Sequence, residues 1–298
     1  AVKAGVDMEM ASRTYLENLE GLVQEGQVSA ERIDTMAANV LRTKFRLGLF
    51  ERHHTDPSVF PVPGNEDHLR EAHRAALRSV VLLKNDGGVL PLAPESLTSL
   101  AVLGPLADDG LEQLGTWIFD GDPALSRTPL SAIRAQVGDT VEVRYARVLE
   151  TTRSRSREGF EEARTLAADS DAVLLFLGEE AILSGEAHCR ADIGLPGVQE
   201  DLIRELAQEG KPLVLVLMAG RPLALEGIEP HVDAILYAWH PGSMGGPAIA
   251  DLLFGVESPS GKLPVTFPRV TGQIPIYYSH KNTGKPARAA ASGQSSAI

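Results

Sequence analysis

Short apolar runs in the second part of the chain constrain its fold more than any other feature. Several of these runs are continuous rather than alternating, as in strands that are buried on both faces of a parallel sheet. Segments with helical periodicity separate most of them. The sequence therefore predicts a doubly wound, mostly parallel α/β sandwich over residues 67–284. The expected strands are at about residues 100–103, 141–145, 172–177, 213–218 and 234–237, and the expected helices at about 66–81, 157–168, 197–208 and 244–254.

The first 50 residues show helical patterns without a sheet of their own. Ser29 is the predicted N-cap of a helix with one apolar stripe, which ends at Gly48, and an earlier helix is expected at about residues 13–24. Helices of this kind do not make an independent domain of the usual sort. Residues 51–66 contain three prolines and a glycine. We therefore predict that they form a linker before the sandwich.

The composition narrows the possible functions. The chain of 298 residues has 40 acidic and 28 basic residues and a formal net charge of -12, which argues against a nucleic-acid partner because such a partner requires a concentrated basic surface. No stretch approaches the roughly twenty apolar residues of a membrane span. Cys189 is the single cysteine and the histidines are scattered, so no zinc pattern exists. We expect no cofactor and no metal, and the sequence contains neither a serine-hydrolase elbow nor a correctly placed phosphate loop.

A long polar loop follows the strand expected at residues 172–177. It continues for about twenty residues before the next helical pattern, and loops of that length are generally functional or disordered. It carries three carboxylates, those of Glu179, Glu180 and Glu186. Because ligands of open α/β sheets collect outside the carboxyl ends of the strands, this loop is predicted to form part of a site. Glu186 is the first candidate for its chemistry.

The loop also begins a series of motifs that resembles a known family. They are S-G-E-A-H-C-R, L-P-G-V-Q-E-D-L-I, G-K-P-L-V-L-V-L-M-A-G-R-P-L, W-H-P-G-S-M-G-G-P-A-I-A-D-L-L-F-G and S-P-S-G-K-L-P-V-T-F-P. In their order and spacing, these motifs are similar to the second domain of a β-glucosidase of glycoside hydrolase family 3, and the resemblance covers roughly residues 1–284. It implies that residues 1–50 are the C-terminal remnant of a truncated (β/α)8 barrel. Residues 285–298 lack apolar periodicity and are expected to be a disordered tail.

The resemblance implies a division of catalytic roles between two domains. In this family the nucleophile is an aspartate of the barrel and the general acid/base is a glutamate on a loop of the sandwich, and Glu186 occupies that motif. Glu180 is the alternative catalytic residue. Retaining hydrolysis needs the two carboxyl groups about 5 to 5.5 Å apart. The nucleophile is expected upstream of Ala1, so we expect a fragment that is inactive without the missing barrel domain.

Three further side chains are predicted to bind substrate. The resemblance places Trp117 at the aglycone-side subsite, where an indole offers a flat apolar body to a sugar ring, and core packing is the alternative. His188 and Arg190 are expected to bond to Glu186 or to sugar hydroxyls, or to make structural loop contacts.

The implied substrate is an oligosaccharide or an aryl or alkyl β-glycoside with a terminal non-reducing β-D-glucosyl residue. β-Xylosidase specificity is an alternative within the enzyme class. A non-catalytic α/β module that binds a carbohydrate or another small ligand is the alternative from a different class. A periplasmic or secreted location is compatible with the family, but the sequence itself does not indicate a compartment.

Overall fold

The computed structural model describes residues 1–281 and 284, and it divides the chain into two compact units, Ala1–Val62 and Pro63–Ile298. The division falls inside the predicted linker. The tail predicted to be disordered, residues 285–298, lies outside the described residues. Within the described ranges, no helix is long and apolar enough to cross a membrane.

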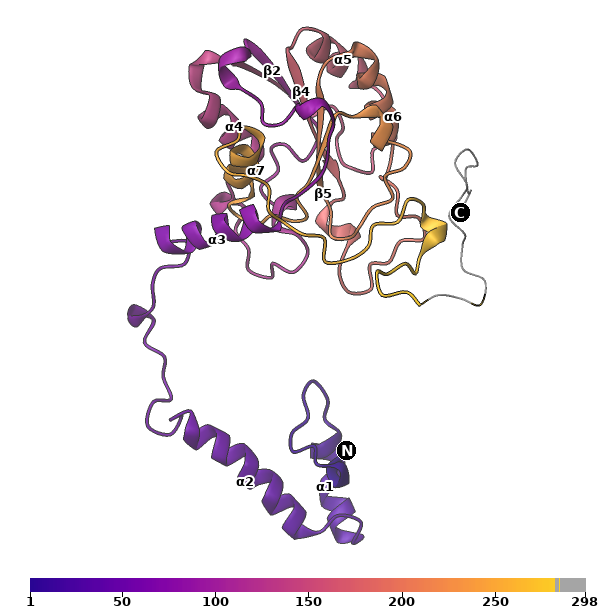
Figure 1. Ribbon diagram of the computed structural model, residues 1–298. Coiled ribbons are helices and arrows are strands. Elements are labelled where there is room, and N and C mark those ends of the chain that lie inside the picture. The colour runs from indigo at the N-terminus through magenta and orange to yellow at the C-terminus, as the bar shows by residue number, and fades with distance from the viewer. Residues whose placement is uncertain (282–283, 285–298) are drawn as a thin grey trace. The chain divides into compact units, whose positions relative to one another are not determined.

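The first unit contains two α-helices, α1 (Thr14–Gln24) and α2 (Ala30–Arg46) (Figure 1). Ser29 is the N-cap of α2, as predicted, because its hydroxyl accepts a hydrogen bond from the Arg32 amide at 3.2 Å. The Arg32 guanidinium in turn contacts the Asp7 carboxylate at 2.9 Å. A small apolar cluster holds the unit together, and it consists of Val2, Val28 and Met36 with partly buried neighbours.

The second unit is built on one six-stranded sheet with the strand order β1-β6-β5-β4-β2-β3. β1 pairs with β6 in the antiparallel direction and all other pairs are parallel, so the predicted doubly wound, mostly parallel architecture is confirmed. The strands are β1 (Val81–Asn85), β2 (Ser99–Leu103), β3 (Glu142–Ala146), β4 (Ala172–Gly178), β5 (Leu213–Met218) and β6 (Ala234–Tyr237). The helices are α3 (Glu66–Ser79), α4 (Pro129–Val137), α5 (Phe160–Ala168), α6 (Gln199–Leu206) and α7 (Gly245–Leu253).

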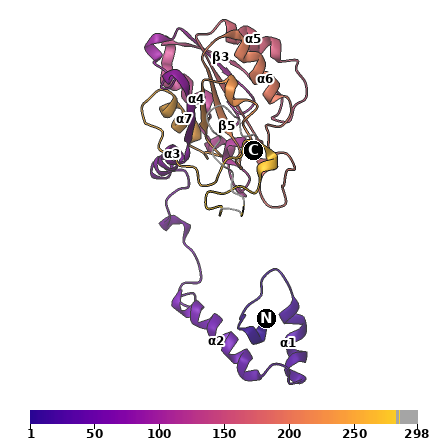
Figure 2. The same ribbon diagram turned by 45° about the vertical axis from the view of Figure 1, so that its right-hand side comes forward.

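Helices cover both faces of the sheet. α4 and α7 pack on one face and α5 and α6 on the other, as two views show (Figures 1 and 2). In β4, Leu174 and Phe176 belong to the core on the side of α4 and α7, whereas Leu175 and Leu177 belong to the core on the side of α5 and α6. All four side chains are fully buried. This double burial is the reason why the apolar runs of the central strands are continuous.

Two elements differ from the prediction. The helix expected at residues 66–81 ends at Ser79, and Val81 begins β1. The periodicity of this short apolar run fits a helix and a strand equally well. Its pairing with β6 makes it a strand. The strand expected at residues 100–103, which precedes Trp117, is therefore the second strand of the sandwich. α4 was not predicted, although Thr128 caps its first turn and Pro129 follows directly, which is a typical helix start.

The strand order reverses between β2 and β4. The chain leaves β2 toward β3 on one side and leaves β4 toward β5 on the other, while β2 and β4 are direct neighbours. This is a topological switch point, and in open α/β sheets the crevice outside the carboxyl ends of such strands is the usual ligand site. The loops that follow these two strands carry Trp117 and Glu186.

Candidate active site

Glu186 lies at the tip of a tight turn after β4. The His188 amide donates to the Gly185 carbonyl at 3.2 Å, and Ala187 has a φ of 62°, as the third residue of a type II turn requires. Gly185 has a φ of 109°, and a Cβ atom there would lie 2.5 Å from the Thr116 methyl group, so only glycine fits this position. The Glu186 side chain is exposed, and none of residues 1–281 and 284 hydrogen-bonds or ion-pairs with its carboxylate.

Glu180 has a different environment. Its carboxylate accepts hydrogen bonds from the Thr152 hydroxyl at 2.7 Å and from the Arg153 guanidinium at 2.9 Å. Burial disfavours the charge of Glu180, but the bonds to Arg153 and Thr152 outweigh burial and hold its pKa below the ordinary value. A general acid must carry a proton at the working pH. These contacts therefore favour Glu186 over Glu180 as the proton donor.

Glu179 is completely buried and is neutralised by two arginines. Arg190 donates to one carboxylate oxygen, and Arg221 donates to the other at 3.0 Å. Arg190 also donates to the Gly194 carbonyl at 3.0 Å. Its observed contacts are thus structural loop contacts, and its predicted contact with substrate stays a prediction.

His188 also makes a contact within the loop. Its Nδ1 atom lies 3.1 Å from the Ser184 carbonyl oxygen, and the ring is half-buried. In the described part of the chain this contact joins the two ends of the turn and does not involve Glu186. Binding of a sugar hydroxyl by His188 stays a prediction.

Trp117 lies on the loop that follows β2. Its side chain is 61% exposed, and the neighbouring Phe119 is 88% exposed with a ring centroid 6.1 Å from that of Trp117. Trp239, in contrast, is partly buried against the core, where its ring packs edge-on against Tyr237 at 4.8 Å. The two exposed rings form an apolar surface at the carboxyl edge of the sheet, which suits the apolar face of a sugar or aryl group.

Polar contacts fix the two loops to each other. The Thr116 hydroxyl bonds to the carbonyls of Ala181 and, at 2.8 Å, Ser184, and the Ala181 amide donates to the Glu112 carboxylate. Burial raises the pKa of Glu112. We did not predict these residues from the sequence because their partners are 65 to 69 positions away. Through these contacts, Trp117 is held next to the loop that carries Glu186.

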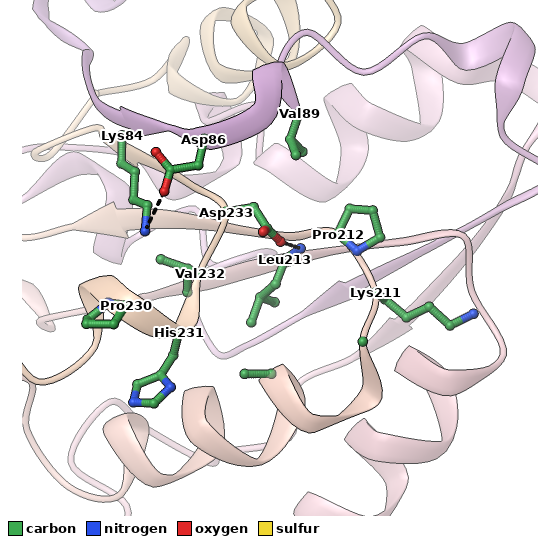
Figure 3. Close-up of a pocket in the computed structure, with 12 residues that line it drawn as sticks. Lys84, Asp86, Val89, Lys211, Pro212, Leu213, Pro230, His231, Val232 and Asp233 are labelled. Atoms are coloured by element: carbon green, nitrogen blue, oxygen red, sulfur yellow. Dashed lines mark hydrogen bonds and ion pairs between the residues drawn. The ribbon is translucent and has the colours of Figure 1, made fainter.

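A cavity of about 580 Å³ lies at the opposite edge of the sheet, beside the first residues of β5 and β6 (Figure 3). Its charged groups already have partners within the protein. Lys84 contacts Glu229 at 2.9 Å and Asp86 at 3.1 Å, and the Asp233 carboxylate accepts a hydrogen bond from the Leu213 amide at 2.8 Å. These pairs join the segments at the amino ends of the strands. We therefore do not assign the candidate site to this cavity, and we place it at the carboxyl edge of the sheet.

The chain is similar to known proteins over most of its length. Residues 80–295 match the model of the Glycosyl hydrolase family 3 C-terminal domain. The chain is 42% identical to the periplasmic beta-glucosidase of Salmonella typhimurium, over 96% of this chain and 40% of that protein. It is 35% identical to a beta-xylosidase of Formosa agariphila, over 93% of this chain and 40% of that protein.

A solved structure gives the same result. The beta-glucosidase from Listeria innocua in complex with isofagomine superposes with a TM-score of 0.87 at 35% identity, over 99% of this chain and 41% of that chain. The chain thus spans about 40% of the length of these relatives. It belongs to glycoside hydrolase family 3, and its six-stranded α/β sandwich is the C-terminal domain of that family.

Proposed function

We propose that this chain supplies the general acid/base, Glu186, of a retaining exo-acting β-glycosidase of the β-glucosidase type. The observation that carries the proposal is the contrast among the three loop carboxylates. Glu179 and Glu180 are held by arginines, whereas Glu186 is exposed at the switch point of the sheet and has no ion pair or hydrogen bond to its carboxylate among the residues that the structure describes. A carboxyl group that gives up and regains a proton in each cycle needs such freedom.

The proposed chemistry has two steps. In the first, a nucleophilic carboxylate attacks the anomeric carbon while Glu186 donates its proton to the departing glycosidic oxygen. In the second, the Glu186 carboxylate removes a proton from water, which attacks the anomeric carbon and releases the nucleophile. The nucleophile is proposed to be an aspartate of a barrel domain, as the family resemblance implies. The 298-residue chain should therefore show essentially no turnover by itself.

The proposed substrate is a β-glucoside with an apolar or sugar aglycone. The β-glucosidase of Salmonella typhimurium is more similar to this chain than the β-xylosidase of Formosa agariphila is, at 42% against 35% identity, which supports glucosidase ahead of xylosidase specificity. Trp117 and Phe119 offer an apolar surface for the aglycone. The second candidate function is a non-catalytic module that binds a glycoside at the same edge.

A chimaera tests the proposal. In it, this chain replaces the aligned region of the Salmonella typhimurium relative, so that Glu186 is combined with the remainder of that protein. Glu186→Ala should lower turnover of cellobiose by about 10²- to 10⁴-fold, because the glucose that leaves from cellobiose requires a proton on the departing oxygen. The glycosylation step on a dinitrophenyl glucoside should fall much less, and azide, which needs no base, should restore turnover and yield β-glucosyl azide. Glu158→Ala, at an exposed site, is the matched control.

Two results would contradict the proposal. Equal losses on both substrates without an azide product would remove Glu186 from the acid/base role and make Glu180 the next residue to test. A folded chimaera that binds a β-glucoside but does not hydrolyse it would support the binding module instead.

A further inference from the structure

We infer that Arg221 is a positioning residue for the acid/base turn, and this inference rests on the proposed role of Glu186. The Arg221 Nη2 atom donates to the Leu183 carbonyl and, at 3.1 Å, to the His188 carbonyl. These carbonyls stand immediately before and after residues 184–187, the segment that contains Glu186. One guanidinium group therefore closes the base of the turn.

Arg221 is itself anchored to three neighbouring strands. Its Nε atom donates at 3.0 Å to Glu179, which directly follows β4 and whose amide donates to the Met218 carbonyl at the end of β5. The Arg221 carbonyl accepts a hydrogen bond from the hydroxyl of Tyr237, a fully buried residue of β6. The sheet thus fixes the position of the guanidinium, and the guanidinium holds the turn in place relative to the sheet.

The two arginines on Glu179 have different roles. Arg190 contacts the other carboxylate oxygen and the Gly194 carbonyl, and it makes no hydrogen bond to Leu183 or His188. Burial of a lone carboxylate is costly unless it is paired, so Arg190 contributes charge compensation at Glu179. Only Arg221 combines this ion pair with bonds to both ends of the turn.

Lysine cannot replace this set of contacts. The planar guanidinium presents several donors in a fixed fork, whereas an ammonium group is a point charge on a flexible chain. A lysine at position 221 has a single nitrogen, so it could neutralise Glu179 or bond to the two carbonyls but could not occupy the positions of both Nε and Nη2. A displacement of about 1 Å in a catalytic group can lower the rate about 10²-fold, so loss of the fork should reduce proton transfer by Glu186.

Hydrogen exchange on the full 298-residue chain tests the inference without any activity. In Arg221→Lys, the hydrogen-bonded amides of Leu183, Ser184 and His188 should exchange about ten- to a hundredfold faster, as expected for the loss of one or two charge-assisted hydrogen bonds. Arg190→Lys should change these amides less. Arg164→Lys is the matched control, because Arg164 lies on α5, outside the loop, and forms an ion pair with Glu209 at 2.8 Å. Unchanged exchange at residues 183–188 in Arg221→Lys would overturn the inference.

The chimaera supplies the kinetic test. Arg221→Lys should reduce hydrolysis of cellobiose about 10²-fold and the glycosylation step on a dinitrophenyl glucoside much less, with an unchanged KM for the activated substrate. A merely structural role would lower both reactions equally, and that result would overturn the inference. If the unsubstituted chimaera is inactive, the proposed function fails, but the exchange measurement still decides the role of Arg221.

A milder variant covers the case in which Arg221→Lys does not fold. Tyr237→Phe removes the hydroxyl bond to the Arg221 carbonyl and keeps the ring that packs against Trp239 and Phe267. Exchange at residues 183–188 should then increase in the same direction but by a smaller factor. No increase in this variant would overturn the inference as well.

Discussion

Gln199→Leu should remove, from a fully buried position, a side chain that hydrogen-bonds to four backbone groups at once. The Gln199 side chain is 0% exposed, and its Oε1 atom accepts from the Gly178 amide at 2.8 Å. Its Nε2 atom donates to the carbonyls of Gly178 and Thr152, both at 2.8 Å, and of Pro196 at 3.0 Å. Gln199 thereby bonds to both peptide groups at the last residue of β4, directly before Glu179.

The magnitude follows from the groups that lose their partner. A buried polar group without a hydrogen bond costs about 1 to 3 kcal/mol, and here one amide and three carbonyls are affected. A carbonyl oxygen tolerates the loss of a partner better than an amide does, so the lower end of this range applies to the three carbonyls. The buried leucine side chain offsets part of the loss. We expect a net destabilisation of about 3 to 5 kcal/mol, or a fall in Tm of roughly 6 to 20 °C for a domain of this size.

Urea unfolding followed by tryptophan fluorescence measures this change. Both tryptophans, Trp117 and Trp239, belong to the second unit, so the signal reports the α/β sandwich. Gln208→Leu is the control, since Gln208 is exposed and makes a single bond to the Arg204 carbonyl at 3.3 Å. Gln199→Glu should be at least as destabilising as Gln199→Leu, because it places a carboxylate against three carbonyls. A loss in Gln199→Leu within about 0.5 kcal/mol of the control, which is typical of surface substitutions, would refute the reasoning.

Two further predictions concern pH and substrate. The hydroxyl and amide of Thr98 and the amide of Ser99 bond to Asp171 and lower its pKa to about 2. Because the folded-state pKa is depressed, this stabilisation is complete above the unfolded-state pKa of about 4 and is lost as the pH falls toward 2. In Asp171→Asn, the urea concentration at the midpoint of unfolding should therefore fall less steeply as the pH is lowered from about 4 toward 2. An unchanged pH dependence would count against this account. In the chimaera, Trp117→Ala should raise KM for an aryl β-glucoside about tenfold by removing ring stacking, and an unchanged KM would favour a structural role.

The local pattern of the sequence was sufficient to predict the central strands. β4 and β5 are long apolar runs that are buried on both faces of the sheet. Such a continuous run indicates a buried parallel strand without information from the rest of the chain. β1 lacks this signal, since it directly follows α3 and its side chains after Val81 are only partly buried. Its antiparallel partner β6 lies about 150 residues further along the chain. Periodicity within a short window cannot report a pairing of that kind.

The same limit applies to the site. The long loop and the motif around Glu186 were visible in the sequence, and the exposed position of Trp117 agrees with the loop expected after a strand. The residues that support the loop were not visible as such. Arg221 is 42 positions from Glu179, and Thr116 is 65 positions from Ala181. These contacts depend on the strand order, which brings the loops after β2, β4 and β5 to adjacent places at one edge of the sheet.

This strand order explains how one loop can be both rigid and accessible. β4 lies between β2 and β5, so the loop that follows it is held from one side by Thr116 and from the other by Arg221. Both residues bond to carbonyls at the base of the turn, and neither contacts the Glu186 side chain. The base of the turn is therefore fixed, while none of the described residues pairs with the Glu186 carboxylate at its tip. A residue that first donates a proton and then accepts one needs this combination, because its position must be constant while its carboxyl group stays open to the reacting oxygen atoms.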